Sequence, residues 1–261
     1  MKFLLLLLFL INFNSVFSCE FENLNKKIPS LLGLANNNMT ESIFNTIIQK
    51  VSDVFEPQIK ERNGKLYVIK VWKNNKANAL AQQYGSNPTT FQVLFFGGIA
   101  RHPMMTNDAF ALVVCHEFGH HLGGAPKRTS RSWSSVEGQA DYWGSSKCLR
   151  NIFQNDDNIK IISNMNIDSE VLSKCSLAFS SNAMEKALCV RVAIAGISVA
   201  KTLNSFIKNA KDISVMTPSK NVVSSTNQSH PSSQCRLDTY INSSMCDIDE
   251  FGYRPSCWFF N

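Results

Sequence analysis

The residues of this chain most able to do chemistry lie in one stretch, ALVVCHEFGHHLGG, from Ala111 to Gly124. It holds two histidines four positions apart, His116 and His120, and Glu117 directly follows the first. Positions four apart share one face of a helix, so two imidazoles can bind one zinc ion and leave coordination positions open for a further ligand and water. The carboxylate of Glu117 would lie beside that ion, where it can accept a proton from water. The spacing therefore predicts one Zn²⁺ per chain, with Glu117 as the general base.

A third metal ligand has to come from another part of the chain. The metzincin pattern HExxHxxGxxH would place it at position 126, but Pro126 stands there. Seventeen residues beyond His120 the sequence reads EGQAD, in which Glu137 and Asp141 are again four positions apart. We expect Glu137 to be the third ligand and Asp141 to accept a hydrogen bond from a ligand imidazole, which fixes the orientation of that ring. A solvated acidic face would be the interpretation if this pair stood alone.

The three remaining histidines differ in what they predict. His121 is adjacent to His120 and points about 100° away around a helix, so it predicts packing or a hydrogen bond and not a ligand. His102, in ARHP, has no partner in the motif and predicts a structural role. His230 precedes a proline, with Arg236 six residues later. A His-Pro pair commonly opens a helix, so on its own it predicts a cap.

The motifs HExxH, ExxxD in EGQAD and HPxxxxR in HPSSQCR together resemble those of the gluzincin metallopeptidases of the HtpX-like, CAAX-prenyl-endopeptidase type. The segment NALAQQYG, which starts at Asn78, is similar to the edge strand that precedes the active-site helix in that family. The likeness covers roughly residues 65–240. There are two departures: the gap between His120 and Glu137 is shorter than most members show, and the transmembrane helices of the integral-membrane members are missing. Both indicate a compact, exported form.

The resemblance implies a zincin-like metallopeptidase domain, with the ligands and the base already named in the same roles. It also implies that Asp141 orients a ligand histidine. His230 would approach the metal and donate a hydrogen bond to the developing oxyanion. Arg236 would hold in place the acidic cluster, that is, Glu137 and Asp141. An oxyanion donor contributes most when it is held in place before the reaction.

Hydrophobic periodicity predicts an α+β fold that is mainly helical, with a small β-sheet beside the HExxH helix. Helices are expected over about 40–59, 107–122, 134–153, 169–179, 182–208 and from about 231. Thr40, Thr106 and either Ser134 or Ser135 are the expected N-caps of the first three. Strands are expected over 65–72 and 91–98, with an irregular polar segment over 74–88 between them, and the aromatic tail is expected to dock.

The first residues predict an export signal over 1–18, because Lys2 is followed by an apolar run that ends in small residues. Residues 16–19 also resemble a bacterial lipobox, in which Cys19 would become the lipidated first residue; the alternative is an ordinary disulfide cysteine. No later segment predicts a membrane span. We therefore expect a single domain over 19–261, either a periplasmic or cell-envelope lipoprotein or a secreted protein, with membrane contact only through an N-terminal lipid.

Eight cysteines accompany this signal, and thiols in an oxidising compartment tend to form disulfides. If Cys19 is lipidated, at least one other cysteine is unpaired. We expect Cys115 to be that one, because it lies inside the proposed active-site helix. The sequence does not decide how the others pair. They are Cys148, Cys175, Cys189, Cys235, Cys246 and Cys257.

The net charge of +6 is modest, and the densest basic cluster, PKRTSR over 126–131, is short and lacks interleaved aromatic residues. It predicts a solvated loop and no nucleic-acid partner. The leading hypothesis is an exported zinc endopeptidase that cleaves unfolded or envelope polypeptides laid along a sheet edge. The alternative is a catalytically idle zincin-fold lipoprotein with a structural or scaffolding role. The presence of Glu117 favours the enzyme, because a pseudoenzyme commonly loses its base.

Overall fold

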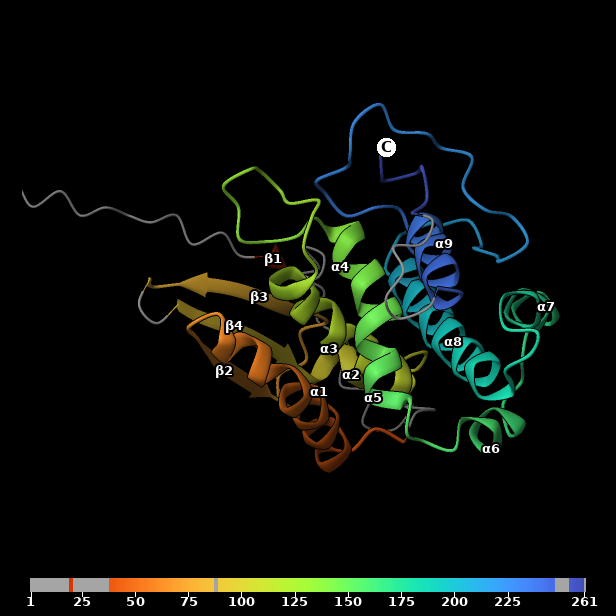
Figure 1. Cartoon of the computed structure of the whole chain (residues 1–261), viewed down its shortest axis with the longest axis horizontal. Helices are drawn as coiled ribbons and strands as arrows, with labels where there is room; N and C mark the ends of the chain where they lie inside the picture. Colours follow the sequence, from red (N-terminus) through yellow and green to blue (C-terminus); the bar gives the residue numbers. More distant parts are fainter. Residues whose placement is uncertain (1–18, 21–37, 87–88, 247–253, 261) are drawn as a thin grey trace, which may run out of the picture.

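A computed structural model describes residues 19–20, 38–86, 89–246 and 254–260, and these form a mixed α+β fold (Figure 1). The predicted export signal, 1–18, lies outside the described residues, so it stays a prediction, as does lipidation of Cys19. Figure 1 shows the sheet on one side of α3 and the helices α8 and α9 on the other. The helices are α1 (Glu41–Glu61), α2 (Gly97–Ala100), α3 (Asn107–Leu122), α4 (Glu137–Trp143), the π-helical η1 (Gly144–Leu149), α5 (Arg150–Phe153), α6 (Asn158–Ser163), α7 (Ser169–Ala178), α8 (Ala183–Ser205) and α9 (Ser233–Ser244).

The central element is α3, and its predicted N-cap is confirmed. The Thr106 hydroxyl accepts a hydrogen bond from the Ala109 amide at 3.1 Å, which satisfies a donor that the first turn would otherwise leave free. Every residue from Ala109 to Leu122 is buried, as expected for a helix that other elements surround on all sides. Thr40 caps α1 in the same way, accepting from the Ile43 amide. The HExxH motif is therefore held on a rigid, enclosed rod.

The sheet has the strand order β1-β3-β4-β2. β2 (Gly64–Val71) runs parallel to β4 (Thr89–Phe96), while β3 (Ala79–Tyr84) is antiparallel to β4 and the two-residue β1 (Cys19–Glu20) is antiparallel to β3. The expectation of an irregular segment over 74–88 is therefore wrong, whereas β3 lies where the resemblance implied a strand from Asn78. The second half of β3 is polar because it is less buried than the first, which hides the two-residue alternation of a strand.

The region of α4 also departs from the predicted single helix with a serine cap. α4 begins at Glu137 with Val136 as its cap residue, and neither preceding serine caps it. The Ser135 hydroxyl donates instead to the Gly124 carbonyl at 2.7 Å, and the Ser135 carbonyl faces His120. The helix then widens into η1 and ends with α5 at Phe153, where the sequence predicted its end.

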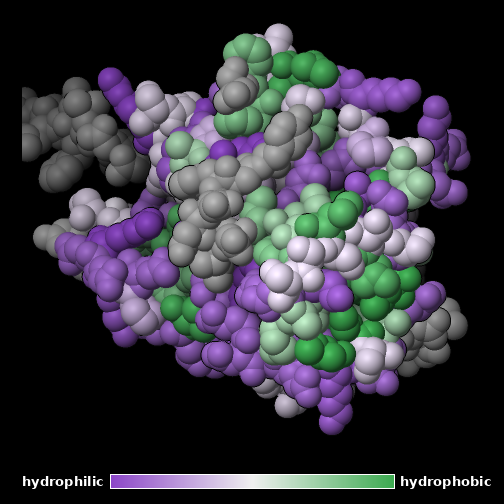
Figure 2. Space-filling model, turned by 45° about the vertical axis from the view of Figure 1, so that its right-hand side comes forward, coloured by the Kyte–Doolittle hydropathy of each residue, from purple (hydrophilic) through white to green (hydrophobic). Residues whose placement is uncertain are grey.

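The main hydrophobic core lies between α1, α3, α8 and the sheet. Phe44 of α1 stacks on Phe110 of α3 with ring centroids 5.1 Å apart, and both rings are fully buried. On the face shown in Figure 2, hydrophilic and hydrophobic residues are interspersed, and the hydrophobic ones form small separate areas. Within the described residues, the helices are too short or too polar to span a bilayer.

Three disulfides are present: Cys115–Cys148 joins α3 to η1, Cys175–Cys189 joins α7 to α8, and Cys235–Cys257 joins α9 to the tail. Of the cysteines whose side chains are described, Cys246 is the free one. The expectation that Cys115 is unpaired is wrong. It lies one position before His116, about 100° around the helix, so its sulfur faces η1 and Cys148 while the histidine faces α4. Three disulfides fit an oxidising, extracellular environment.

Replacing both Cys115 and Cys148 by serine should lower the free energy of unfolding by about 2–4 kcal/mol, because the crosslink restricts the unfolded chain. Guanidinium denaturation measures the change, and Cys246→Ser is the control, expected to leave stability nearly unchanged. The Cys115–Cys148 disulfide can also be tested by alkylating the protein after it is unfolded without a reducing agent. Detection of alkylated Cys115 by mass spectrometry would contradict the disulfide.

Candidate metal centre

The three predicted ligands come together between α3 and α4. The Nε2 atoms of His116 and His120 lie 3.3 and 3.5 Å from Oε2 of Glu137, and 3.1 Å from each other. All three side chains are fully buried, and their donor atoms lie within 4.8 Å of one another. Two imidazoles and a carboxylate at this spacing form a group that could hold a metal ion.

A glycine inside the motif permits this approach of the two helices. Gly119, in HEFGH, faces the backbone of Ala140 in α4, and a β-carbon at Gly119 would lie 2.8 Å from the Ala140 carbonyl oxygen. Any larger residue would push α4 away from α3, and with it the carboxylate of Glu137. The glycine therefore sets the distance between the imidazole pair and the third donor.

The outer nitrogens of both imidazoles have acceptors. Nδ1 of His116 lies 2.8 Å from Oδ1 of Asp141, and Nδ1 of His120 lies 3.0 Å from the Ser135 carbonyl. Carboxylate and carbonyl oxygens accept, so each Nδ1 donates its proton away from the cluster. Each Nε2 faces Glu137, and its lone pair is available to a metal ion when the ring is neutral. Asp141 thus takes the orienting place that the sequence predicted for it.

Buried charges in the cluster shift several pKa values. Burial alone would raise the pKa of Asp141, but the nearby Arg236 and His116 charges outweigh it and bring that pKa to about 2. Burial would likewise raise the pKa of Glu137, yet His120 and His116 hold it well below its usual range. Burial lowers the pKa of His116, and the charge of Asp141 reverses this, so the net shift is upward. Both carboxylates are therefore ionised at neutral pH.

Asp141 is held by two side chains of α9. Arg236 donates from Nη2 to Oδ1 of Asp141 at 2.6 Å, which places this arginine beside the acidic cluster as predicted. The Tyr240 hydroxyl donates to the same oxygen, also at 2.6 Å. The sequence interpretation missed Tyr240, although its position four residues after Arg236 puts both on one face of the helix.

Glu117 is the most unusual group at the site. It is fully buried, and neither carboxylate oxygen has a hydrogen-bond partner among the described residues. Burial raises its pKa to about 7, against the opposing effect of His116 and His120. A buried carboxylate without donors is costly, so a structure that keeps one needs a functional reason for it.

His230 also reaches the cluster. Its Nε2 lies 3.2 Å from Oε2 of Glu137, and with 27% of its side chain exposed it is the solvent-facing histidine of the group. Burial lowers its pKa to about 4, so the ring is neutral at pH 7. The two histidines that were not expected to bind metal lie outside the cluster. His121 contacts the Gln92 carbonyl at 3.1 Å, and His102 packs on Phe206.

Arg128 is a second residue at the site that was not expected from the sequence, and it pairs with Glu137. Its Nη2 donates to Oε1 of Glu137 at 2.9 Å, from the loop that joins α3 to α4. The same loop was expected to be merely solvated. It instead neutralises one oxygen of Glu137 and leaves the other facing the histidines.

The C-terminal tail supports the start of α4. The Trp258 ring packs so closely on Gly138 that a β-carbon there would overlap it, and its Nε1 donates to the Thr239 hydroxyl at 3.0 Å. The Cys235–Cys257 disulfide ties this tail to α9. The predicted docking of the tail is thus confirmed at Trp258, directly beside Glu137.

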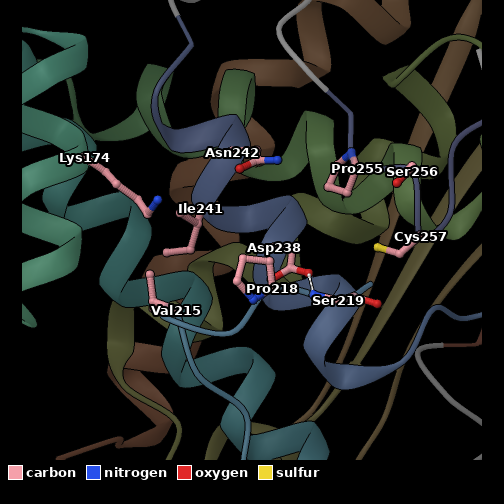
Figure 3. Close-up of a pocket in the computed structure, with 10 residues that line it drawn as sticks. All are labelled: Lys174, Val215, Pro218, Ser219, Asp238, Ile241, Asn242, Pro255, Ser256 and Cys257. Carbon is pink, nitrogen blue, oxygen red and sulfur yellow. Dashed lines mark hydrogen bonds between the residues drawn. The ribbon is translucent and has the colours of Figure 1, made fainter. Parts of the chain in front are cut away.

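A cavity of about 270 Å³ lies elsewhere, between α9, the segment that precedes it and the tail (Figure 3). Its lining includes none of the three candidate ligands, His116, His120 and Glu137. Its carboxylate, Asp238, already accepts hydrogen bonds from the Ser219 amide at 2.7 Å and from Gln234 at 2.8 Å. The cavity is therefore separate from the metal group.

Comparison of the chain with family models, curated proteins and solved structures gives no match.

The purified protein should bind about one divalent transition-metal ion per chain, with His116→Ala, His120→Ala and Glu137→Ala each losing most of it. Each change removes one of the three side chains that could hold the ion. Elemental analysis after dialysis measures the stoichiometry. His102→Ala is the control, because that histidine lies outside the group. Retention of a full equivalent by all three variants would contradict the assignment.

Proposed function

We propose that this protein is an exported zinc-dependent metalloendopeptidase, similar in its chemistry to the HtpX-like gluzincins. The observation that carries the proposal is Glu117, a fully buried carboxylate that no described residue donates to, next to a converging pair of imidazoles. A purely structural metal site needs three or four ligands but no such neighbour. A hydrolytic site needs a base there.

Zinc is the metal that this donor set suits best. Catalytic zinc commonly has three protein ligands drawn from histidine and acidic residues, with a further position left for water or substrate. The backing of the two imidazoles by Asp141 and the Ser135 carbonyl is the outer-shell arrangement typical of such sites. When bound, zinc supplies a Lewis acid that polarises a carbonyl and acidifies water.

The chain's own residues would move the proton and stabilise charge. Glu117 accepts a proton on its carboxylate from the attacking water and returns it to the nitrogen of the leaving amine. A base with a pKa of about 7 is matched to both transfers near neutral pH. His230 is neutral and partly exposed, so one ring N–H can donate to the oxyanion that develops on the substrate.

The outer edge of β3 favours a polypeptide as the substrate. β4 pairs along one side of β3, whereas on the other side the two described residues of β1 pair with Leu80 and Ala81. In the described part of the chain, Gln82–Tyr84 have no strand partner on that side. An extended peptide can add there through its backbone, which requires the substrate to be unfolded or flexible. Envelope proteins that have lost their fold would supply such segments.

Glu117→Gln should retain about one zinc per chain and lose cleavage of an unfolded protein substrate by about 10²–10⁴-fold, because the amide cannot accept the proton. Gel electrophoresis of a reduced, alkylated substrate follows the cleavage, and elemental analysis follows the zinc. Glu56→Gln is the matched control: this half-buried carboxylate of α1 pairs with Lys60 and lies outside the metal centre. Zinc binding by the wild type without any cleavage would assign the idle, scaffolding role instead.

A further inference from the structure

We propose that Tyr240 is a positioning residue for the metal centre: through Asp141 it fixes the ring of the ligand His116. The inference rests on the proposed function, because it assigns Tyr240 a part in holding the proposed zinc ligand. Tyr240 does not touch the ligands itself, so its effect must pass through hydrogen bonds.

The hydroxyl of Tyr240 has a defined direction. It donates to Oδ1 of Asp141 at 2.6 Å and accepts from Nη2 of Arg236 at 3.3 Å. The side chain is fully buried. Burial raises its pKa well above the usual value, so the hydroxyl keeps the proton that it donates.

One oxygen of Asp141 collects all of these contacts. Oδ1 accepts from Tyr240, from Arg236 and from Nδ1 of His116, whereas Oδ2 has no hydrogen-bond partner among the described residues. Tilting the carboxylate away from this orientation would therefore weaken three hydrogen bonds at once. Two donors from α9 hold it in the orientation in which it can keep the His116 proton on Nδ1.

The packing of α8 on α9 fixes the position of the hydroxyl. A β-carbon at Gly196 of α8 would overlap Cβ of Tyr240, so the two helices are in direct contact at this point. The opposite face of α9 carries Asp238, which points to the separate cavity and binds the Ser219 amide (Figure 3). Tyr240 thus lies on the side of α9 that faces the metal centre, and α8 packs against it at Gly196.

The test is Tyr240→Phe, which removes the hydroxyl and keeps the ring. We expect zinc affinity, measured by competition with a chelator, to fall about tenfold, at the lower end of the effect of removing outer-shell partners. In ¹⁵N-histidine NMR spectra of the metal-free protein, the His116 Nδ1–H signal should shift or broaden. Tyr142→Phe is the matched control, because that buried hydroxyl contacts Cys246. It should change neither measurement.

Wild-type zinc affinity together with an unchanged His116 signal in Tyr240→Phe would overturn the inference, even if the variant unfolds at a lower temperature. If the wild type binds no zinc, the proposed function fails instead. The NMR comparison in the metal-free protein still decides whether Tyr240 positions His116.

Discussion

The contact on which the structure of this site depends is the buried approach of one carboxylate to two imidazoles. Glu137, His116 and His120 are excluded from solvent, and burying an ionised carboxylate is costly unless it is paired. The surrounding elements supply that pairing. The loop between α3 and α4 brings Arg128 to the outer oxygen of Glu137, and α9 brings its donors to the aspartate behind His116. The positions of this loop and of α9 against the site follow from these requirements.

Steric constraints complete what the charges require. Gly119 and Gly138 let α3 and the Trp258 tail approach α4 from two sides, and the Cys235–Cys257 disulfide holds that tail on α9. The start of α4 is therefore enclosed by parts of the chain more than a hundred residues apart. Such an enclosed start can keep the Glu137 oxygen directed at the histidines before any ion arrives.

The sequence predicted the features that depend on local spacing, and it missed those that depend on distant contacts. The Thr106 cap and both four-residue pairs of site residues follow from helix geometry, so they were predictable. The polar half of β3 gains its strand partner from β4, and Cys115 gains its sulfur partner 33 positions away. Arg128 was interpreted as solvated because nothing nearby in sequence shows that its loop folds back over Glu137. These outcomes depend on tertiary packing, which local patterns do not encode.

Anomalous diffraction at the zinc absorption edge, from crystals of the zinc-loaded protein, is the decisive test of the metal centre. One peak is expected among the three ligands, about 2.0–2.1 Å from Nε2 of His116 and of His120 and about 2.0–2.2 Å from an oxygen of Glu137. A peak that the two histidines bind while the Glu137 carboxylate points away, or no peak between these side chains, would contradict it.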